Sequence, residues 1–331
     1  MDSYTVIQQI GENTTTSVFR AIRNADGLPV VMKNFHLDAM EPEHLRPLTS
    51  PLSSTVKNVP SEHIMLEKVK DIPGCVQMID YIDDSENGKW VIVLEDLCTL
   101  GYSNLAKDIG ENESPMEDYV VSWIMRELTF LLDRLHSLGI LHCDIKPDNM
   151  FVNYEDQKIK LIDFNLALDL TQSTSGVAPG CTPEYAPPEV LIQRKPWTTA
   201  GEVWSIGCTA FLLLCRRFPF ENPFMSNCSS PAYPQCMPET TVRAQFGNYH
   251  GRVLFSGKLR TGTQGSLQPS SNGCLSPKAK DFLLLCLSRI PDQRPSLKAL
   301  SQHPFLSLKL PSTCAVSSSM GLSRSRAVLV S

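Results

Sequence analysis

The chain lacks the features that mark a secreted, membrane-spanning or zinc-binding protein. Its first residues contain neither a basic stretch nor a long apolar one, and its longest apolar runs are about half of what a bilayer span requires. Eleven cysteines are scattered without a CxxC pair, and two of them end an apolar "FLLLC" run. This pattern favours buried free thiols over a disulfide framework or a zinc site. We therefore expect an intracellular protein, cytoplasmic or nuclear, that is monomeric and has no membrane partner.

Basic charge is also scarce. The formal net charge is −5, which argues against nucleic acid as the main partner, because nucleic-acid binding usually requires a basic surface. A small acidic excess is compatible with basic peptide substrates, although it commonly serves only solubility. With 331 residues, 42% hydrophobic and 20% charged, the chain can bury a large core in one or two lobes.

The first part of the chain is expected to form a small sheet with one helix. Runs rich in β-branched and aromatic residues, separated by turn-forming segments, predict five strands. These strands cover residues 3–10, 16–23, 28–35, 74–84 and 89–96. The Pro- and Ser-rich residues 36–60 are predicted as a loop, and residues 61–70 as a helix capped by Ser61.

The second part is expected to be mainly helical. Segments with helical periodicity cover residues 115–139, 199–215, 276–290 and 296–306, the last two opened by serine caps. The segment 199–215 is apolar on nearly all sides, which is typical of a buried helix. Two short strands are predicted in "NMFVN" and "KIKLIDF".

These elements predict an α+β fold with a small β-rich lobe at 1–95 and a larger helical lobe at 96–307. Residues 221–273 are rich in Pro, Ser, Asn and Gly and far exceed ordinary loop length, so we expect an irregular insertion there. The Ser-rich residues 308–331 are predicted to be a disordered tail.

Several short motifs follow one another at compatible spacings. They are the turn "GENTTTSV", the strand lysine of "VVMK", a helix glutamate, "HCDIKPDN", "DFN", "PEYAPPEV" and "PDQRP". In this order they resemble the signature set of the protein kinases, over roughly residues 1–307. The resemblance implies the two-lobed kinase fold, with ATP and Mg²⁺ bound between the lobes and protein substrates as the phosphate acceptors.

The polar residues of "HCDIKPDN" and "DFN" suit phosphoryl transfer. Asp144 can accept the proton of an incoming hydroxyl, and Lys146 can offset charge on the transferring phosphate. Asn149 and Asp163 offer Mg²⁺ a neutral and an anionic oxygen. Taken alone, Asp144 would be interpreted as a turn carboxylate; its spacing from Lys146 and Asn149 favours a catalytic base.

On the nucleotide side, Lys33 resembles the lysine that holds the α/β-phosphates, and Glu62 resembles its helix partner. An edge-strand lysine and a solvated first-turn glutamate remain alternatives, and His63 or Glu67 would shift the register of the pair. The other expected nucleotide contacts are Gly11, Val31, Leu94 and Glu95, with Val18 and Phe151 on either side of the adenine.

Lys146 resembles the lysine of the serine/threonine class, and Thr182 resembles the threonine that bonds to the catalytic aspartate and lysine in that class. Glu189 and Arg294 resemble the buried ion pair that anchors the activation segment. Within the kinases, motifs such as "GILHCDIKPDN" and "VWSIGC" look most like the Pim group and its calcium/calmodulin-kinase relatives. Such kinases often prefer arginine upstream of the target serine, which Asp148 can help to bind; a loop carboxylate that faces water is the equal alternative.

The phosphate loop departs from the family pattern. A full G-x-G-x-x-G-x-V needs three glycines, but only Gly11 remains, with Asn13 and Thr16 in place of the other two. Asn tolerates positive φ better than most residues, whereas the β-branched Thr16 restricts close approach to phosphates. Val31 replaces a small alanine and is expected to narrow the adenine pocket. We expect weakened nucleotide affinity rather than its loss.

Three further departures concern control and support. Cys143 replaces an arginine that pairs with a phosphorylated activation loop in many kinases, and cysteine cannot form that pair. We therefore expect activity that does not depend on phosphorylation of Thr171, Ser173, Thr174 or Ser175. Asn165 replaces a glycine and would carry a modest penalty if its φ must be positive. Glu202 stands where many kinases have an aspartate that supports the catalytic-loop backbone.

Three functions therefore remain open. The first is a serine/threonine protein kinase, which the complete set of polar residues favours. The second is a pseudokinase that uses the fold as a binding scaffold, which the degraded phosphate loop and "DFN" favour. A small-molecule phosphotransferase of kinase-like fold is the third, and the long activation segment with Glu189 and Arg294 counts against it.

Overall fold

The computed structural model describes residues 3–49, 56–112, 114–172, 180–191, 193–219 and 275–309. The predicted insertion at 221–273, the tail from 310 onward, and Ser173, Thr174 and Ser175 lie outside these residues.

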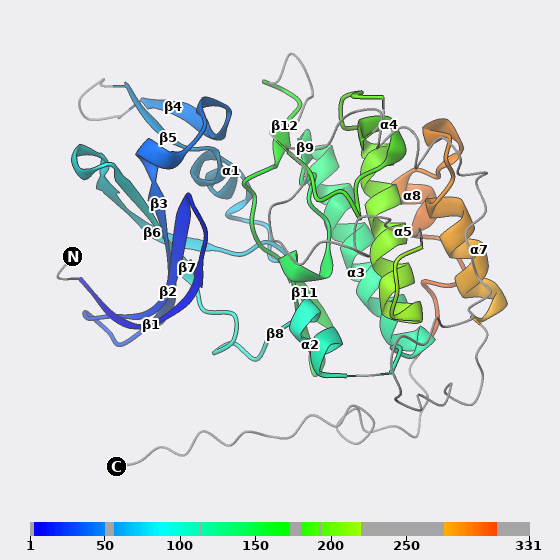
Figure 1. Cartoon of the computed structure of the whole chain (residues 1–331). Helices are drawn as coiled ribbons and strands as arrows, with labels where there is room; N and C mark the ends of the chain where they lie inside the picture. The colour runs from blue at the N-terminus through cyan, green and yellow to red at the C-terminus, as the bar shows by residue number, and fades with distance from the viewer. Residues whose placement is uncertain are drawn as a thin grey trace, which may run out of the picture.

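The N-terminal lobe is built on a five-stranded antiparallel sheet in the order β1-β2-β3-β7-β6 (Figure 1). Its strands are β1 (Tyr4–Glu12), β2 (Thr16–Arg23), β3 (Pro29–His36), β6 (Met78–Asp84) and β7 (Lys89–Glu95). A 3-10 turn at Ser85–Asn87 joins β6 to β7, and α1 (Ser61–Val69) supplies the helix of this lobe. The five predicted strands are confirmed to within a few residues.

The prediction of a loop over 36–60 was wrong. This segment contains two 3-10 turns, Leu37–Ala39 and Pro42–His44, and an antiparallel hairpin of β4 (Leu45–Thr49) and β5 (Val56–Pro60). A two-stranded hairpin leaves every strand with a free edge, where prolines are tolerated, so proline content did not exclude strands here. Val59 is fully buried in the main core, which ties the hairpin to the lobe.

The start of α1 also differs from expectation. Ser61 is the first residue of the helix rather than its cap, and the capping position is held by Pro60 without a side-chain hydrogen bond. The Ser61 hydroxyl donates instead to the main-chain oxygen of Asn165 at 3.3 Å. The first turn of α1 is therefore attached to the "DFN" segment.

The C-terminal lobe is mainly helical, on the right in Figure 1. Its helices are α2 (Leu105–Glu111), α3 (Asp118–Ser137), α4 (Pro188–Leu191), α5 (Thr199–Cys215), α7 (Pro277–Cys286) and α8 (Leu297–Leu300), with a 3-10 turn at Pro291–Gln293. Short strands β8 (Ser103–Asn104), β9 (Ile140–Leu141), β10 (Met150–Asn153), β11 (Lys158–Leu161) and β12 (Leu168–Asp169) lie on the side of the N-terminal lobe.

Two predicted helices are shorter than expected, although their serine caps are confirmed. Ser276 and Ser296 accept hydrogen bonds at 3.2 Å from the main chain three residues later. The second of these helices, α8, ends at Leu300 instead of 306, because Pro304 disfavours helical geometry at the residue before it. Among the described residues, no helix is long and apolar enough to cross a membrane.

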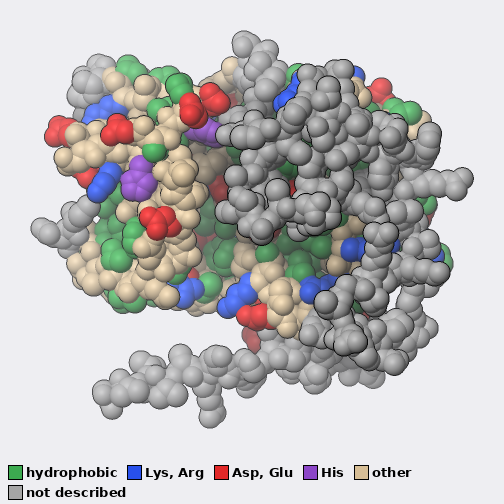
Figure 2. All heavy atoms as spheres, in the orientation of Figure 1, with side chains coloured by type: hydrophobic (Ala, Val, Ile, Leu, Met, Phe, Trp, Pro, Cys, Tyr) green, Lys and Arg blue, Asp and Glu red, His purple; other side chains and the backbone are tan. Residues whose placement is uncertain are grey.

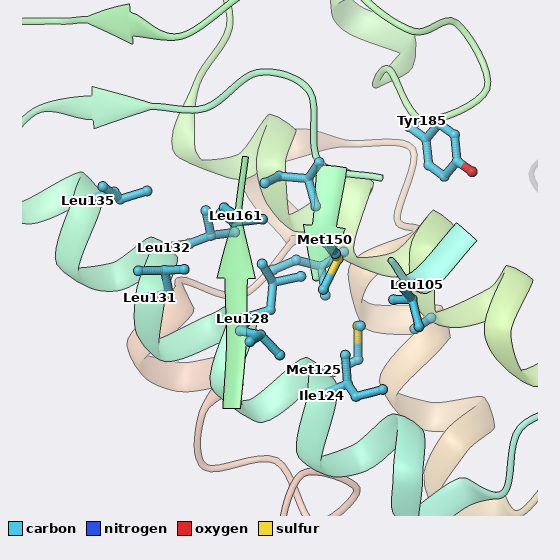
Figure 3. Close-up of a cluster of buried hydrophobic side chains, with 14 of the residues drawn as sticks. Leu105, Ile124, Met125, Leu128, Leu131, Leu132, Leu135, Met150, Leu161 and Tyr185 are labelled. Carbon is cyan, nitrogen blue, oxygen red and sulfur yellow. The ribbon is translucent and has the colours of Figure 1, made fainter. Parts of the chain in front are cut away.

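The core places the active-site segments on a rigid base. Apolar side chains of α3, among them Ile124, Leu128 and Leu132, pack under Met150 of β10 and Leu161 of β11 (Figure 3). All five are fully buried. Packing on the core therefore fixes β10 and β11. The loop that leads into β10 and the "DFN" segment that follows β11 are each anchored at one end by these strands. On the visible face, acidic and basic side chains of the described residues are interspersed (Figure 2).

Candidate active site

The loop between β9 and β10 holds Asp144 at the centre of a group of polar contacts. The Oδ2 atom of Asp144 lies 2.8 Å from Nζ of Lys146 and accepts a hydrogen bond from the Asn149 amide at 2.7 Å. Its Oδ1 accepts a hydrogen bond from the Thr182 hydroxyl at 2.6 Å, and Lys146 donates to the same hydroxyl at 2.7 Å. Thr182 thus contacts both Asp144 and Lys146, as its resemblance implied.

A second group of charges joins the two lobes. Nζ of Lys33 on β3 lies 2.6 Å from Oε2 of Glu62 on α1 and 3.0 Å from Oδ1 of Asp163. Glu62 is 1% exposed, so it is not the solvated first-turn glutamate that the sequence left open. Neither His63 nor Glu67 takes its place opposite Lys33, because the ion pair is formed by Glu62.

Burial and pairing set the charges of this group. Burial disfavours the charge of Lys33, but Asp163 and Glu62 together outweigh it and raise the pKa of Lys33 above its ordinary value. Burial raises the pKa of Glu62 to about 6, because Lys33 offsets only part of the desolvation cost. For Asp163 burial acts in the same sense, yet the facing Lys33 prevails and lowers its pKa.

Asn149 and Asp163, the expected metal ligands, lie on adjoining segments. The main-chain N–H of Ile162 donates to the Asn149 carbonyl at 3.0 Å, which joins the two segments. The amide nitrogen of Asn149 faces Asp144, which leaves the amide oxygen for a metal. The Asp163 side chain is 36% exposed, and Lys33 contacts its Oδ1. One amide and one carboxylate oxygen, completed by phosphate and water oxygens, fit the ligand preference of Mg²⁺.

The expected nucleotide contacts lie on paired strands of the five-stranded sheet, except for Phe151, which lies on β10 of the three-stranded sheet. The register pairs Gly11 with Val18, Val18 with Lys33 and Val31 with Leu94, and sets Phe151 opposite Lys160 on β11. The Glu95 side chain departs from expectation. Its carboxylate pairs with Lys160 and accepts a hydrogen bond from the Gln77 main chain at 2.9 Å. It is therefore committed to holding β11 and the segment before β6, and we assign no nucleotide contact to it.

The comparisons with known proteins agree with this geometry. The model of the family described as "Protein kinase domain" matches residues 4–306.

The chain belongs to the protein kinase family.

Two relatives illustrate the similarity. Serine/threonine-protein kinase Nek5 of Homo sapiens is 32% identical over 225 residues, which cover 67% of this chain and 29% of that protein. A probable serine/threonine-protein kinase of Dictyostelium discoideum is 25% identical over 318 residues, covering 92% of this chain and 48% of that protein. This kinase chain therefore spans less than half the length of these curated relatives. Neither relative is named as a Pim or calcium/calmodulin kinase.

Glu202 on α5 supports the catalytic loop of the kinase domain. Its Oε1 accepts hydrogen bonds from the main-chain N–H groups of His142 at 2.5 Å and Cys143 at 2.8 Å. Its Oε2 lies 2.5 Å from Nε2 of His136 on α3. Burial disfavours the Glu202 charge, but these donors outweigh it and lower the pKa of Glu202 below its ordinary value. The additional methylene therefore lets the carboxylate contact the loop and α3 together.

Cys143 occupies an apolar environment rather than a site for a phosphate. It is 1% exposed and belongs to a cluster with Leu141, Leu168, Ala186 and Trp197, which come from both sides of the activation segment. Burial, reinforced by the nearby carboxylates, raises the thiol pKa well above its ordinary value. The backbone at Cys143 has φ of +62°. Many kinases have at this position an arginine that pairs with a phosphate group of the activation loop. In this chain the position is packed with apolar side chains instead.

The backbone at Asn165 does not have the positive φ that would carry a conformational penalty. In "DFN" it is Asp163 that has a left-handed backbone, with φ of +63°. Phe164 is fully buried and its ring lies 4.8 Å from that of His142, so the segment is packed inward with Asp163 on Lys33.

The predicted anchor of the activation segment is present. Arg294 and Glu189 form a two-pronged ion pair with distances of 2.7 and 2.8 Å, and both side chains are buried. Arg294 also donates to the carbonyl groups of Ser288 and Ala200, and its guanidinium lies 5.0 Å from the ring of Trp204.

Sequence reasoning missed two contacts that position the site. One is His136 on Glu202, and the other is an ion pair between Lys68 of α1 and Asp169 of β12. Oδ1 of Asp169 also accepts hydrogen bonds from the main-chain N–H and hydroxyl of Thr171, at 2.9 and 2.5 Å. The members of each pair lie far apart in the chain, and no local pattern distinguishes them from polar residues on the surface. Only the three-dimensional fold brings them together.

Proposed function

We propose that this chain is an active serine/threonine protein kinase that uses Mg²⁺ and ATP. The observation that carries the proposal is the group around Asp144. A carboxylate held by Lys146, Asn149 and Thr182 is oriented and only 7% exposed, as a catalytic base requires. Bound nucleotide and metal supply the γ-phosphate and a positive charge next to it.

The residues divide the work between them. Asp144 orients the hydroxyl of a protein serine or threonine and accepts its proton as the hydroxyl oxygen forms its bond to the γ-phosphorus of ATP, while the bond from that phosphorus to the β,γ-bridging oxygen breaks and ADP leaves. Lys146 stabilises the charge of the transferring group, and Lys33 holds the phosphates from the side of the N-terminal lobe. Asn149 and Asp163 provide the metal ligands.

We further propose that the kinase is active without phosphorylation of its activation segment. Lys68 on α1 and Asp169 on β12 already form a charged link between α1 and the start of this segment. Cys143 lies in a cluster whose members, among the described residues, are apolar and include no cationic side chain. Both features support a position of α1 in which Glu62 keeps its ion pair with Lys33 although the activation segment is not phosphorylated.

This part is tested with phosphatase-treated protein. We expect treatment to leave kcat unchanged, and Lys68→Met to lower kcat/KM for ATP by up to about fivefold, because α1 loses its contact with β12. The matched control is Lys70→Met, at a 59% exposed side chain in the C-cap position of α1, which should have no effect. A large fall in kcat after phosphatase treatment would contradict the proposal.

For substrates, we propose proteins with basic residues upstream of the target hydroxyl, in keeping with the resemblance to the Pim and calcium/calmodulin-kinase group. The side chain of Asp148, beside Asn149, is exposed and acidic, which supports this preference. We also propose that the protein is a monomer and is located inside the cell, in the cytoplasm or the nucleus.

A binding scaffold without catalysis is the second candidate, and the phosphate loop favours it, because Asn13 and Thr16 stand in place of glycines. We separate the two by measuring γ-phosphate transfer to a serine peptide with upstream arginines and to the same peptide with those arginines replaced by alanine. A kinase with the proposed preference phosphorylates the first faster. Tight ATP binding with no transfer to either peptide would favour the scaffold.

A further inference from the structure

The turn between β1 and β2 is closed by its own side chain. The last paired residues of this hairpin are Glu12 and Ser17. Between them, Oδ1 of Asn13 accepts hydrogen bonds from the main-chain N–H groups of Thr15 at 2.9 Å and Thr16 at 2.7 Å. The hydroxyl groups of the same two threonines lie 3.1 and 3.0 Å from this oxygen. One amide oxygen therefore collects the donors at the tip of the turn.

These donors are the ones that a phosphate loop needs. In kinases the loop after the first strand covers the nucleotide phosphates, and consecutive main-chain N–H groups that converge on one point bind anions. In this chain the N–H groups of Thr15 and Thr16 do converge, but the point of convergence is occupied by the Asn13 oxygen.

The neighbouring contacts hold the turn in this form. Asn13 donates its own main-chain N–H to the carbonyl of Thr16 at 2.8 Å, and the carbonyl of Thr15 accepts from the main chain of His36 at 2.9 Å. The ring of His36 also lies 3.0 Å from the Ser17 hydroxyl. Thr16 is only 4% exposed, so the turn is packed against β3. Asparagine favours such turns because its side chain bonds the main chain two residues on.

We propose that the Asn13 carboxamide is a built-in competitor of the nucleotide phosphates. It occupies the two N–H groups, so that phosphates must displace it or bind without the loop. The inference rests on the proposed nucleotide site. It adds a second cause, beyond the loss of the glycines, for the weakened nucleotide affinity that the sequence predicts. The nucleotide is then held mainly by Lys33 and by the metal ligands rather than by the turn.

The test compares ligands that differ only in their phosphates. Adenosine, ADP and ATP are titrated in the presence of Mg²⁺ into the whole chain, as wild type, Asn13→Gly and Asn13→Asp. Asn13→Gly frees both N–H groups and should strengthen binding of ADP and ATP about tenfold, with adenosine unchanged. Asn13→Asp keeps the acceptor and the turn but adds a negative charge, and should weaken ATP about tenfold or more, again with adenosine unchanged.

Asn24→Gly is the matched control, because it makes the same substitution in the β2–β3 turn of the same sheet, and it should leave all three affinities unchanged. A purely structural role for Asn13 predicts instead that Asn13→Gly weakens all three ligands alike and that Asn13→Asp resembles wild type. Either result would overturn the inference. If all three ligands bind with affinities that do not change in either residue-13 variant, this inference is overturned and the proposed nucleotide site stands. Failure of every variant to bind any of them would overturn the nucleotide site as well.

Discussion

Replacing Glu202 by alanine should detach the catalytic loop from the helical lobe. Glu202 is fully buried, and its carboxylate is the acceptor for the main-chain N–H groups of His142 and Cys143 and for the ring of His136. Alanine leaves these donors without their acceptor in a part of the structure that water does not reach. Asp144 follows Cys143 directly, so the loss acts on catalysis as well as on stability.

The size of the effect follows from the contacts. Each buried donor left without an acceptor costs about 1–3 kcal/mol, so the two main-chain groups alone cost about 2–6 kcal/mol. The missing methylenes leave a cavity that adds about 1 kcal/mol. We expect Glu202→Ala to lower the free energy of unfolding by about 4 kcal/mol. Glu202→Gln keeps the shape and one acceptor oxygen but replaces the other with an NH2 donor and removes the charge, and should cost about 1–2 kcal/mol.

The assay is chemical denaturation followed by kinetics on whichever variants fold. Glu111→Gln, at a 57% exposed side chain on α2, is the control and should change stability by less than about 0.5 kcal/mol. For Glu202→Gln we expect a lower kcat with an unchanged KM for ATP, because the catalytic loop moves and the nucleotide contacts do not. An alanine variant within about 1 kcal/mol of wild type would refute the supporting role assigned to Glu202.

Two more predictions use the other buried charges. Glu62 has its pKa raised to about 6, so it is charged above this pH and protonated below it; kcat/KM for ATP should fall as the pH drops through about 6, and Glu62→Gln should abolish this limb of the pH profile. An unchanged limb in that variant would assign the titration to another group. Glu189→Gln leaves Arg294 buried without its carboxylate and should lower the free energy of unfolding by about 3–5 kcal/mol, whereas a denaturation midpoint equal to that of wild type would show that the ion pair contributes nothing.

The sequence predicted those elements whose signals are local. Runs rich in β-branched and aromatic residues, separated by turn-forming segments, located the five strands of the N-terminal sheet. Serines at the expected capping positions marked the starts of α7 and α8. The pair of Lys33 and Glu62 was predicted because a known family supplies the partner for each residue. The structure was needed to exclude the alternatives for Glu62: its burial excludes a solvated glutamate, and its ion pair with Lys33 excludes His63 and Glu67 as the partner.

The missed features depend on tertiary contacts. Prolines in 36–60 suggested a loop, but the hairpin of β4 and β5 is stabilised by burial of Val59, which no pattern within the segment indicates. Glu95 was included among the nucleotide contacts because of the family resemblance, and the ion pair of its carboxylate with Lys160, 65 residues away, was not predicted. A penalty at Asn165 was expected only if its φ were positive; the structure has positive φ at Asp163 instead, which the sequence did not indicate.

The most direct test of the account is the initial rate of γ-phosphate transfer from Mg·ATP to a serine peptide, measured for phosphatase-treated wild type and for Asp144→Asn. An otherwise identical tyrosine peptide serves as the comparison substrate. The account predicts steady transfer to serine by the treated wild type, little or none to tyrosine, and a loss of at least about a hundredfold in Asp144→Asn with ATP binding retained. Equal transfer by the two proteins, or none by the wild type while ATP remains bound, would contradict it.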